Sequence, residues 1–385
     1  MKIKDIVTFV SKSITPQKGV TYNLYSLPSF DEGKTFEVLD GADIQSNKYD
    51  VPNKCILFNK LNVRFKRVWR IDSHDENKIA STEFLPLVVD EDVVDFQYCY
   101  YLLISDKITN YLCGQNTNTS GSHKRIDPDN FLNIEIKLPK MSIQRQVGKT
   151  LSALDRKIVL NKQINDNLEA MAKQLYDYWF VQFDFPNEEG KPYKSSGGAM
   201  AWNEKLKREI PKEWMASNYT NLFTIGNGQT MPQNEGLVPA YGGNGIVKMV
   251  EISNYPACII IGRVGANCGS IHYSKIPCWV SDNAISICSK NDDWQPFLFY
   301  SLKLYNLSKN KGGSSQPLIT HEALKHLYFP MSEKHINQFC HIVNELQDLI
   351  YSNKQEILKL TKQRDELLPL LMNGQATVNY HLSDD

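Results

Sequence analysis

Two acidic residues and a lysine near residue 130 form the pattern that most invites a catalytic interpretation. Pro128-Asp129 is followed by Glu135-Ile136-Lys137, and two carboxylates with a lysine could hold a divalent metal ion and assist hydrolysis. The gap between the acids is short for such a site, and the alternation IEIKL is typical of a half-buried strand. A related segment later in the chain has His326 and Tyr328 in place of the second acid and the lysine. The sequence therefore does not support metal-dependent hydrolysis.

Other patterns for catalysis and metal binding are also missing. The eight cysteines form no CxxC pair, and the ten-residue spacing of Cys258, Cys268, Cys278 and Cys288 matches no zinc framework. No GxxxxGK[ST] phosphate loop is present, and no Ser/His/Asp signature is evident. The Asn/Asp-Pro-Pro-aromatic motif that adenine methyltransferases carry is absent. We therefore expect neither a catalytic residue nor a metal site in this chain.

The segment Asn53–Arg70 has the residue types that bind nucleic acid. It contains six basic residues and no acid, interleaved with aromatic residues. A strand-like ribbon with its cations on one face can follow a phosphate backbone, and its arginines can reach base edges. The alternative is a solvated basic strand over a hydrophobic face. The candidate DNA-binding residues of this ribbon are Lys60, Arg64, Lys66, Arg67 and Arg70.

Polar loops and glycine-dense turns elsewhere supply further candidates. In the first half of the chain, two basic residues follow the polar loop GQNTNTSGS. In the second half, one candidate lies in the turn GGNG, one directly follows the apolar run CIIIG, and two lie in a polar, basic loop. Such loops can close on a ligand. These candidate DNA-binding residues are Lys124, Arg125, Asn244, Arg263, Lys311 and Gln316.

Two long stretches with heptad spacing are the elements that must position these residues. From Val147 to Trp179, and again from Phe339 to Leu371, mostly apolar residues recur in steps of four and three. This spacing predicts the seam of a helix that packs lengthwise on another helix. Forty residues make a helix of about 60 Å, which is too long for the core of one domain. We expect the two helices to pack on each other, and we expect a further helix over Val93–Leu112.

The two long stretches belong to an internal duplication. Shifted by 192 residues, the seams coincide, and the tripeptide Asn161-Lys162-Gln163 recurs as Asn353-Lys354-Gln355. An extended run that ends in proline precedes each stretch. The sequence therefore predicts a mixed α+β fold with two similar domains and two long helices in an antiparallel, pseudo-twofold coiled coil. The expected parts are a domain at 1–140, a helix at 141–185, a linker and second domain at 186–330, a helix at 331–374 and a tail at 375–385.

Composition excludes some classes of protein. The chain has 385 residues, 42% of them hydrophobic and 22% charged, and its formal net charge is zero. Nucleic-acid binding must therefore come from local patches and not from a global basic field. No apolar run is long enough to span a membrane, and the first residues lack the apolar core of a signal peptide. We expect a cytoplasmic protein.

Taken together, these features resemble the specificity subunit of a type I restriction–modification enzyme over essentially the whole chain. The most specific segments lie in and beside the long helices, and others lie in the two domains. They are IKLPKMSIQRQVGKTLSALDRKI, NKQINDNLEAMAKQLYDYWFVQFDF, LLPLLMNGQATV, ILFNKLNVRFKRVWRI, VPAYGGNGIV, IIIGRVGANCGSIHYSKIPCWVSDNAI and GGSSQPLIT.

The resemblance implies a function. In this family, two target recognition domains each read one half of a split double-stranded DNA sequence, and the paired helices set the spacing and dock two modification subunits. Restriction subunits complete the complex. The resemblance implies no catalytic residue and no cofactor in this chain, since S-adenosylmethionine, ATP and Mg are used by the partner subunits. The alternative is a coiled-coil adaptor that never touches DNA, although an adaptor has no use for two basic, loop-rich domains.

Two asparagines on the seams suggest how the helices keep their register. Asn161 and Asn353 lie near the midpoints of their helices, so antiparallel pairing about a pseudo-twofold axis should bring them together. A polar residue in a seam costs stability, but a matched pair recovers hydrogen bonds and penalises a slipped register. The alternative is that both asparagines face solvent at a break in the seam.

Overall fold

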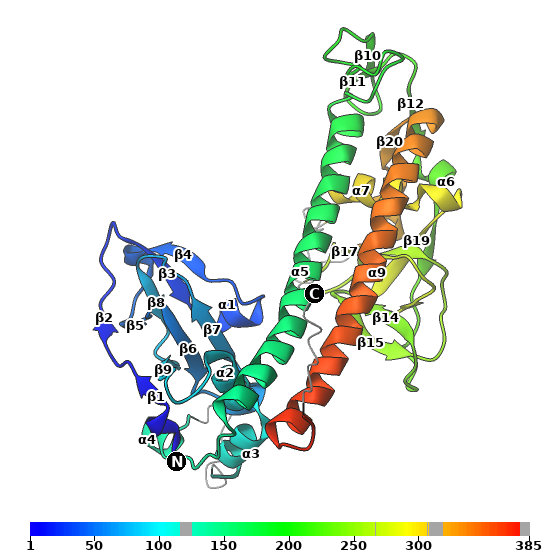
Figure 1. Cartoon of the computed structure of the whole chain (residues 1–385). Coiled ribbons are helices and arrows are strands. Elements are labelled where there is room, and N and C mark those ends of the chain that lie inside the picture. The colour runs from blue at the N-terminus through cyan, green and yellow to red at the C-terminus, as the bar shows by residue number, and fades with distance from the viewer. Residues whose placement is uncertain (116–124, 266, 306, 308–318, 378–385) are drawn as a thin grey trace, which may run out of the picture. The chain divides into compact units, whose positions relative to one another are not determined.

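A computed structural model of the chain describes residues 1–115, 125–265, 267–305, 307 and 319–377. Contacts divide the chain into two compact units. The first comprises Met1–Val159 and Ile357–Asp385, and the second comprises Leu160–Glu356. Each unit holds one mixed α/β domain and a section of both long helices, which Figure 1 labels α5 and α9. The division therefore cuts across the helices, whereas the sequence suggested a separate segment for each.

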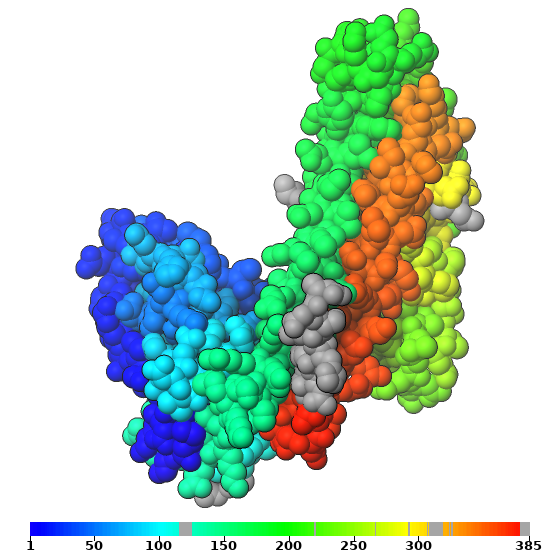
Figure 2. All heavy atoms as spheres, viewed as in Figure 1, coloured from blue at the N-terminus to red at the C-terminus, as the bar shows by residue number. Residues whose placement is uncertain are grey.

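The long helices are α5 (Met141–Tyr176) and α9 (Glu333–Met372), and α5 continues into a π-helix at Asp177–Val181. Every seam position that the heptad spacing predicts is buried or half-buried. In the first unit Arg364 donates to Asp155 over 3.0 Å, and in the second Asn353 donates to Asn165 over 3.0 Å. In the second unit Asn161 also contacts Glu356 and Tyr176 contacts Phe339, so residue numbers on α5 rise as those of their partners on α9 fall. In the first unit Val147 and Leu151 share a cluster with Leu371. Both sections therefore pack antiparallel. Figure 2 shows α5 and α9 side by side in the second unit.

The first domain is built on a four-stranded antiparallel sheet in the order β1-β9-β6-β7, with a second sheet in the order β2-β5-β8-β3-β4. Its strands are β1 (Val7–Phe9), β2 (Ser13–Ile14), β3 (Thr21–Tyr25), β4 (Glu37–Asp40), β5 (Lys48–Asp50), β6 (Lys54–Asn59), β7 (Val68–Asp72), β8 (Lys78–Ala80) and β9 (Phe84–Val89). Its helices are α1 (Leu27–Asp31), α2 (Phe96–Ile104), α3 (Asp106–Gln115) and α4 (Pro128–Leu132). The single helix expected over Val93–Leu112 is wrong, because the backbone is extended at Ser105.

The second domain repeats the main sheet in the equivalent order β13-β19-β16-β17, again antiparallel, beside a sheet in the order β15-β14-β18. These strands are β13 (Phe223–Asn227), β14 (Val238–Gly242), β15 (Gly245–Val250), β16 (Cys258–Gly262), β17 (Ile271–Ser274), β18 (Trp279–Val280) and β19 (Ala284–Ser289). The helices are α6 (Tyr219–Leu222), α7 (Gln295–Leu304) and α8 (His321–Lys325). In each domain a helix follows the sheet, α2 after β9 and α7 after β19, so the predicted duplication extends to the topology.

The hydrophobic cores of the two units repeat as well. In the first unit Val147 and Leu151 of α5 join a cluster that also holds Leu371 of α9. In the second unit Phe339 of α9 joins a cluster that holds Trp179. Shifted by 192 residues, Val147 falls on Phe339 and Trp179 falls on Leu371. Equivalent seam positions therefore complete the core of both units.

The segment expected to be a linker after α5 is folded. β10 (Met200–Asn203) and β11 (Arg208–Pro211) form an antiparallel hairpin. Before it, the Asp184 carboxylate accepts hydrogen bonds from the backbone and the hydroxyl of Ser195, at 2.7 and 2.6 Å. The Phe185 ring stacks on Trp214 with centroids 5.0 Å apart. Glycine, proline and serine here build turns, and the aromatic rings give the segment a core of its own.

The extended runs expected before the long helices differ in kind. β20 (Tyr328–Met331) pairs antiparallel with β12 (Met215–Asn218) before α9. Before α5, a single bridge joins Lys2 to Glu135. The second run is therefore a strand, while the first is an extended segment held at one point.

Gly148 is the one glycine of α5, and its position requires the small residue. A Cβ there would lie 2.7 Å from Asp95 Oδ1 and 2.9 Å from Gln97 Cβ, at the start of α2. We predict that Gly148→Ala lowers the free energy of unfolding by about 1–3 kcal/mol through overpacking. Gly114→Ala in α3 is the matched control, since a Cβ there meets nothing within 4 Å, and it should be neutral or stabilise by up to about 1 kcal/mol. Urea unfolding measures both, and equal effects would contradict the contact.

His335, in the first turn of α9, should make stability depend on pH. Its ring lies 4.0 Å from that of Phe185, and burial, with a smaller effect from Lys334, lowers its pKa from 6.5 to about 4. The unfolded chain therefore takes up a proton that the folded chain resists, so this contribution to stability is lost as the pH falls from 6.5 towards 4. We predict that the stability difference between wild type and His335→Asn shrinks over this range. A difference that stays constant from pH 7 to pH 4.5 would refute the assignment.

Candidate nucleic-acid interface

The predicted basic ribbon is a β-hairpin whose strands are largely buried. β6 and β7 pair with Phe58 opposite Val68 and Ile56 opposite Arg70. The apolar residues of both strands belong to the hydrophobic core. Most of the ribbon's cations lie instead in the connection between the strands, residues 60–67. The interface is therefore a turn at the end of a hairpin and not a flat strand face.

Three cations among the candidates of the first domain are held by acids from distant parts of the chain. Lys66 forms an ion pair with Asp106 at 2.5 Å. Arg67 donates two hydrogen bonds to Asp31, at 2.7 and 2.6 Å, and these bonds lower the pKa of that carboxyl. Arg125 pairs with a carboxylate, that of Glu83, at 2.6 Å. The ribbon contains no acid in its own sequence, but the fold brings acids to it.

Arg70 is held against α2. Its guanidinium donates to the side-chain oxygen of Gln97 and lies 4.8 Å from the centre of the Tyr100 ring. Both partners belong to the helix that packs between the sheet and α5. The position of Arg70 therefore favours a role in joining the sheet to α2.

Lys60 and Arg64 differ from these residues. Lys60 is half-buried and Arg64 is exposed, and neither contacts a carboxylate within the residues that the structure describes. The Lys60 backbone is fixed, since its N–H donates to Glu83 and its carbonyl accepts from Ile126, both at 2.9 Å. These are the two ribbon cations whose charge stays available to a phosphate.

The second domain places two candidates at turns. Asn244 is exposed in the tight turn between β14 and β15. Arg263 follows β16, and its backbone is anchored by Asn283 at 2.9 Å and Ile319 at 3.0 Å. The apolar run CIIIG is a fully buried strand that delivers Arg263 to the following turn, as the sequence indicated. The remaining candidates, Lys124, Lys311 and Gln316, lie outside the described residues.

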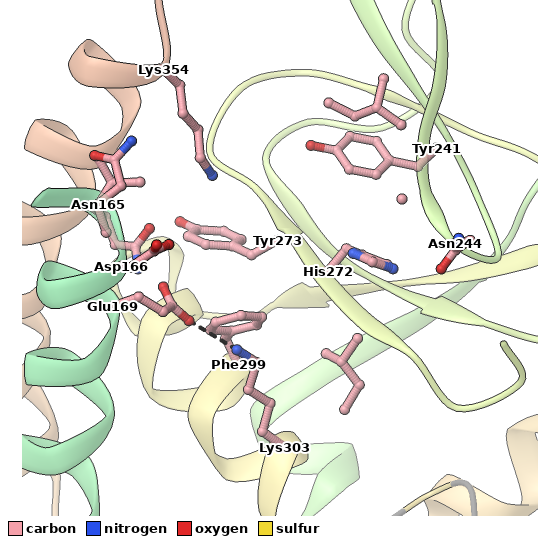
Figure 3. A pocket seen from close by; sticks show the side chains of 15 residues that line it. Asn165, Asp166, Glu169, Tyr241, Asn244, His272, Tyr273, Phe299, Lys303 and Lys354 are labelled. Atoms are coloured by element: carbon pink, nitrogen blue, oxygen red, sulfur yellow. Dashed lines mark hydrogen bonds and ion pairs between the residues drawn. The ribbon is translucent and has the colours of Figure 1, made fainter. Parts of the chain in front are cut away.

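A cavity of about 480 Å³ lies between the helices and the sheets of the second unit. Figure 3 shows Glu169 of α5 meeting Lys303 of α7, an ion pair of 2.9 Å, with Asn244 and His272 on the opposite wall. The Nε2 atom of His272 is buried without a hydrogen-bond partner among the described residues, and burial, then Lys303, lowers the pKa of this ring. Acids and lysines both line the cavity, so it does not concentrate positive charge.

One tyrosine of each domain forms a hydrogen bond to a long helix, and the two helix positions are equivalent in the duplication. In the first unit the Tyr101 hydroxyl donates to Asp155 of α5 over 2.5 Å. In the second unit the Tyr300 hydroxyl accepts from Gln347 of α9 over 3.3 Å, and a shift of 192 residues carries position 155 to 347. Sequence reasoning missed both tyrosines. The pairs Tyr100-Tyr101 and Phe299-Tyr300, each in a helix before a long helix, were the signal that could have found them.

The acidic pattern near residue 130 has no metal-site geometry. Asp129 belongs to the short helix α4, and its N–H donates to the N-cap Asp127. Glu135 lies on the extended segment that bridges to Lys2. Within the described ranges, no three His, Cys, Asp or Glu side chains gather as metal ligands would. No helix in the same ranges is long and apolar enough to span a membrane.

Comparison with known families decides which kind of protein carries these two repeated domains. The family model for the type I restriction modification DNA specificity domain matches residues 1–170 and 211–362. The chain belongs to this family. Its members are specificity subunits of type I restriction–modification systems and are generally non-catalytic, and membership supports a role in DNA-sequence specificity for this chain.

Curated specificity subunits are similar over large parts of the chain. The MjaIX specificity subunit of Methanocaldococcus jannaschii is 23% identical over 332 residues, covering 79% of this chain and 74% of the relative. The EcoprrI specificity subunit of Escherichia coli is 25% identical and covers 67% and 63%. The crystal structure of a type I S subunit from M. genitalium superposes with a TM-score of 0.62 at 18% identity, over 99% of this chain and 96% of that one. At that identity, the superposition shows a shared fold.

For this specificity-domain protein, we predict that the Tyr101 hydroxyl stabilises the first unit. Burial, reinforced by the charge of Asp155, raises the pKa of Tyr101, so the hydroxyl stays protonated and donates to a charged acceptor. Tyr101→Phe should cost about 1.5–3 kcal/mol, since hydrogen bonds to charged groups are the stronger ones. Tyr111→Phe, at a side chain that is 44% exposed, should change stability by less than about 0.5 kcal/mol. Urea titration of both variants checks this, and a neutral Tyr101→Phe would refute it.

Proposed function

We propose that this chain is the DNA-binding specificity subunit of a type I restriction–modification complex, and that each domain reads one half of a bipartite, asymmetric target. The observation that carries the proposal is the repeat of one sheet order in both domains with unlike connecting turns, residues 60–67 and 263–270. A common scaffold supports similar placement on the DNA. Different turn residues support two different half-sites, because base edges are read by side chains.

The paired helices set the spacing between half-sites and dock two modification subunits. Two polar contacts in the seam support a fixed register. Asn161 donates to Glu356 over 2.8 Å, and Asn353 donates to Asn165 over 3.0 Å. Slipping by one heptad would displace one helix along the other by about 10 Å and would break both bonds.

The chemistry of the complex belongs to the partners. The modification subunits transfer a methyl group from S-adenosylmethionine to adenine, and the restriction subunits use ATP and Mg. This chain binds the double-stranded DNA target and so determines where the partners act. The proposal is supported by the family membership.

The second candidate is a coiled-coil adaptor without DNA binding. The ion pairs of Lys66 and Arg67 favour it, because they reduce the free positive charge of the first domain. The shared sheet order of the two domains, combined with different residues in their connecting turns, argues against an adaptor. A salt titration of binding to duplex DNA separates the two candidates, since an adaptor would show no binding.

We predict that Lys60 and Arg64 contribute phosphate contacts in the first domain. In the complex with modification subunits, Lys60→Ala and Arg64→Ala should each weaken binding to duplex DNA. Each should also reduce the slope of the logarithm of the binding constant against the logarithm of the salt concentration by about one, the value for one lost phosphate contact. Lys4→Ala, which removes an exposed cation of the same unit, should leave the slope unchanged. Gel-shift titrations at several salt concentrations measure this. If the double variant Lys60→Ala/Arg64→Ala retains both affinity and slope, the turn does not contact phosphates.

A further inference from the structure

The turn between β6 and β7 presents a large aromatic ring to solvent. Phe65 is 53% exposed, although the neighbouring Val63 is 8% exposed and belongs to the core. A lone exposed apolar residue needs no explanation. Phe65 differs because it lies in the turn that carries the available cations Lys60 and Arg64, at the end of a hairpin.

The turn holds Phe65 in place. Asn62 and Lys66 flank the short 3₁₀ turn Val63–Phe65, and both adopt left-handed backbone conformations, with φ of 51° and 47°. Such strain in residues other than glycine persists where the surroundings enforce it, and it concentrates at functional sites. The Asn59 side chain accepts from the Leu61 N–H at 2.8 Å, and the ion pairs of Lys66 and Arg67 fix the far side. The ring is therefore preorganised in its exposed position.

Two guanidinium groups accompany the ring. The Cζ atoms of Arg64 and Arg67 each lie 4.8 Å from the centre of Phe65. Cations at this distance are attracted by the ring. Arg67 is paired with Asp31, whereas the charge of Arg64 stays available and can draw a phosphate towards the ring. An apolar ring beside a phosphate-binding group matches the apolar wedges that proteins insert between base steps.

The second domain has an independent version of this turn. Arg263-Val264-Gly265 follows β16, the counterpart of β6, and leads towards β17. Val264 is 38% exposed, and Gly265 has a φ of 80°. An arginine again precedes an exposed apolar residue, but valine is too small to fill the gap between two base pairs.

We propose that Phe65 is a wedge that inserts at one base step of the first half-site, while Val264 touches the second half-site without unstacking it. The inference rests on the proposed function and adds the mode of recognition. Pyrimidine–purine steps unstack most easily, so the first half-site should contain a TA or CA/TG step under Phe65. Specificity at that position then comes from DNA deformability and does not require a hydrogen bond to a base.

The test uses the full chain in complex with its modification subunits. A duplex selected from a random pool by the wild-type complex serves as the probe, and permanganate oxidation reports unstacked thymines in the bound DNA. Methyltransferases flip their target base out of the stack, so the thymines opposite the target adenines should react in every variant. Wild type and Phe65→Trp should make one further thymine reactive, in one half-site. Phe65→Ala should abolish that reactivity and weaken specific binding at least tenfold, with non-specific binding unchanged. Val264→Ala is the matched control and should preserve the further reactive thymine.

The outcomes separate the wedge from the proposed function. Specific binding by wild type without the further reactive thymine, or a Phe65→Ala variant that keeps it, overturns the wedge and leaves the proposed function intact. A wild-type complex that selects no sequence overturns the proposed function itself. If Phe65→Ala weakens assembly with the modification subunits and leaves the further reactive thymine, Phe65 contacts protein and the wedge is wrong. Because Phe65 is exposed, the Phe65→Ala variant should unfold at the same temperature as wild type. A lower unfolding temperature would mean that the ring stabilises the fold, and this would count against the wedge.

Discussion

The antiparallel packing of α5 against α9 is the constraint on which both units depend. Neither domain closes its core alone. The first draws Val147 and Leu371 from the two helices, and the second draws Phe339 and Trp179. The first unit therefore needs a helix section from the far end of the chain, as the Arg364–Asp155 contact illustrates. Contacts between such distant residues form late and slow folding, so the first unit should reach its native state only when α9 is available.

The repetition in the sequence predicted most of the fold, for a physical reason. Heptad spacing depends on the helix itself and on one neighbour, so the seams of α5 and α9 could be read directly from residue types. The mixed α+β fold, the duplication and the antiparallel pairing are confirmed. The register could not be placed to within a turn. Asn161 and Asn353 do lie in the seam, where Asn161 donates to Glu356 and Asn353 donates to Asn165. Each therefore bonds a residue about one turn from the other asparagine, and the close approach of the two asparagines stays a prediction. Residue counting locates a midpoint only approximately, while side-chain packing sets the stagger.

The candidate interface was less predictable because electrostatics is set by residues that meet only in the folded chain. The basic ribbon contains no acid, yet Asp31 and Asp106 neutralise Arg67 and Lys66. The composition of the segment after α5 was misleading for a related reason. Its glycines and serines suggested a linker, whereas Asp184 and the ring of Phe185 organise it into a folded segment. In both cases the contacts that determine the outcome are made by residues outside the sequence pattern from which the prediction was made.

The construction of the β6–β7 turn has a consequence for how such proteins diversify. Among residues 60–67, all of them described, only Val63 is buried, and the ends are tied by a hydrogen bond at Asn59 and by ion pairs to Asp31 and Asp106. The fold thus constrains few positions of the turn and leaves the outward-facing ones open to exchange. Mutations there should change the outward-facing surface of the turn at little cost to folding. A lineage can therefore accumulate changes in the outward face of this turn while its helices and sheets stay the same.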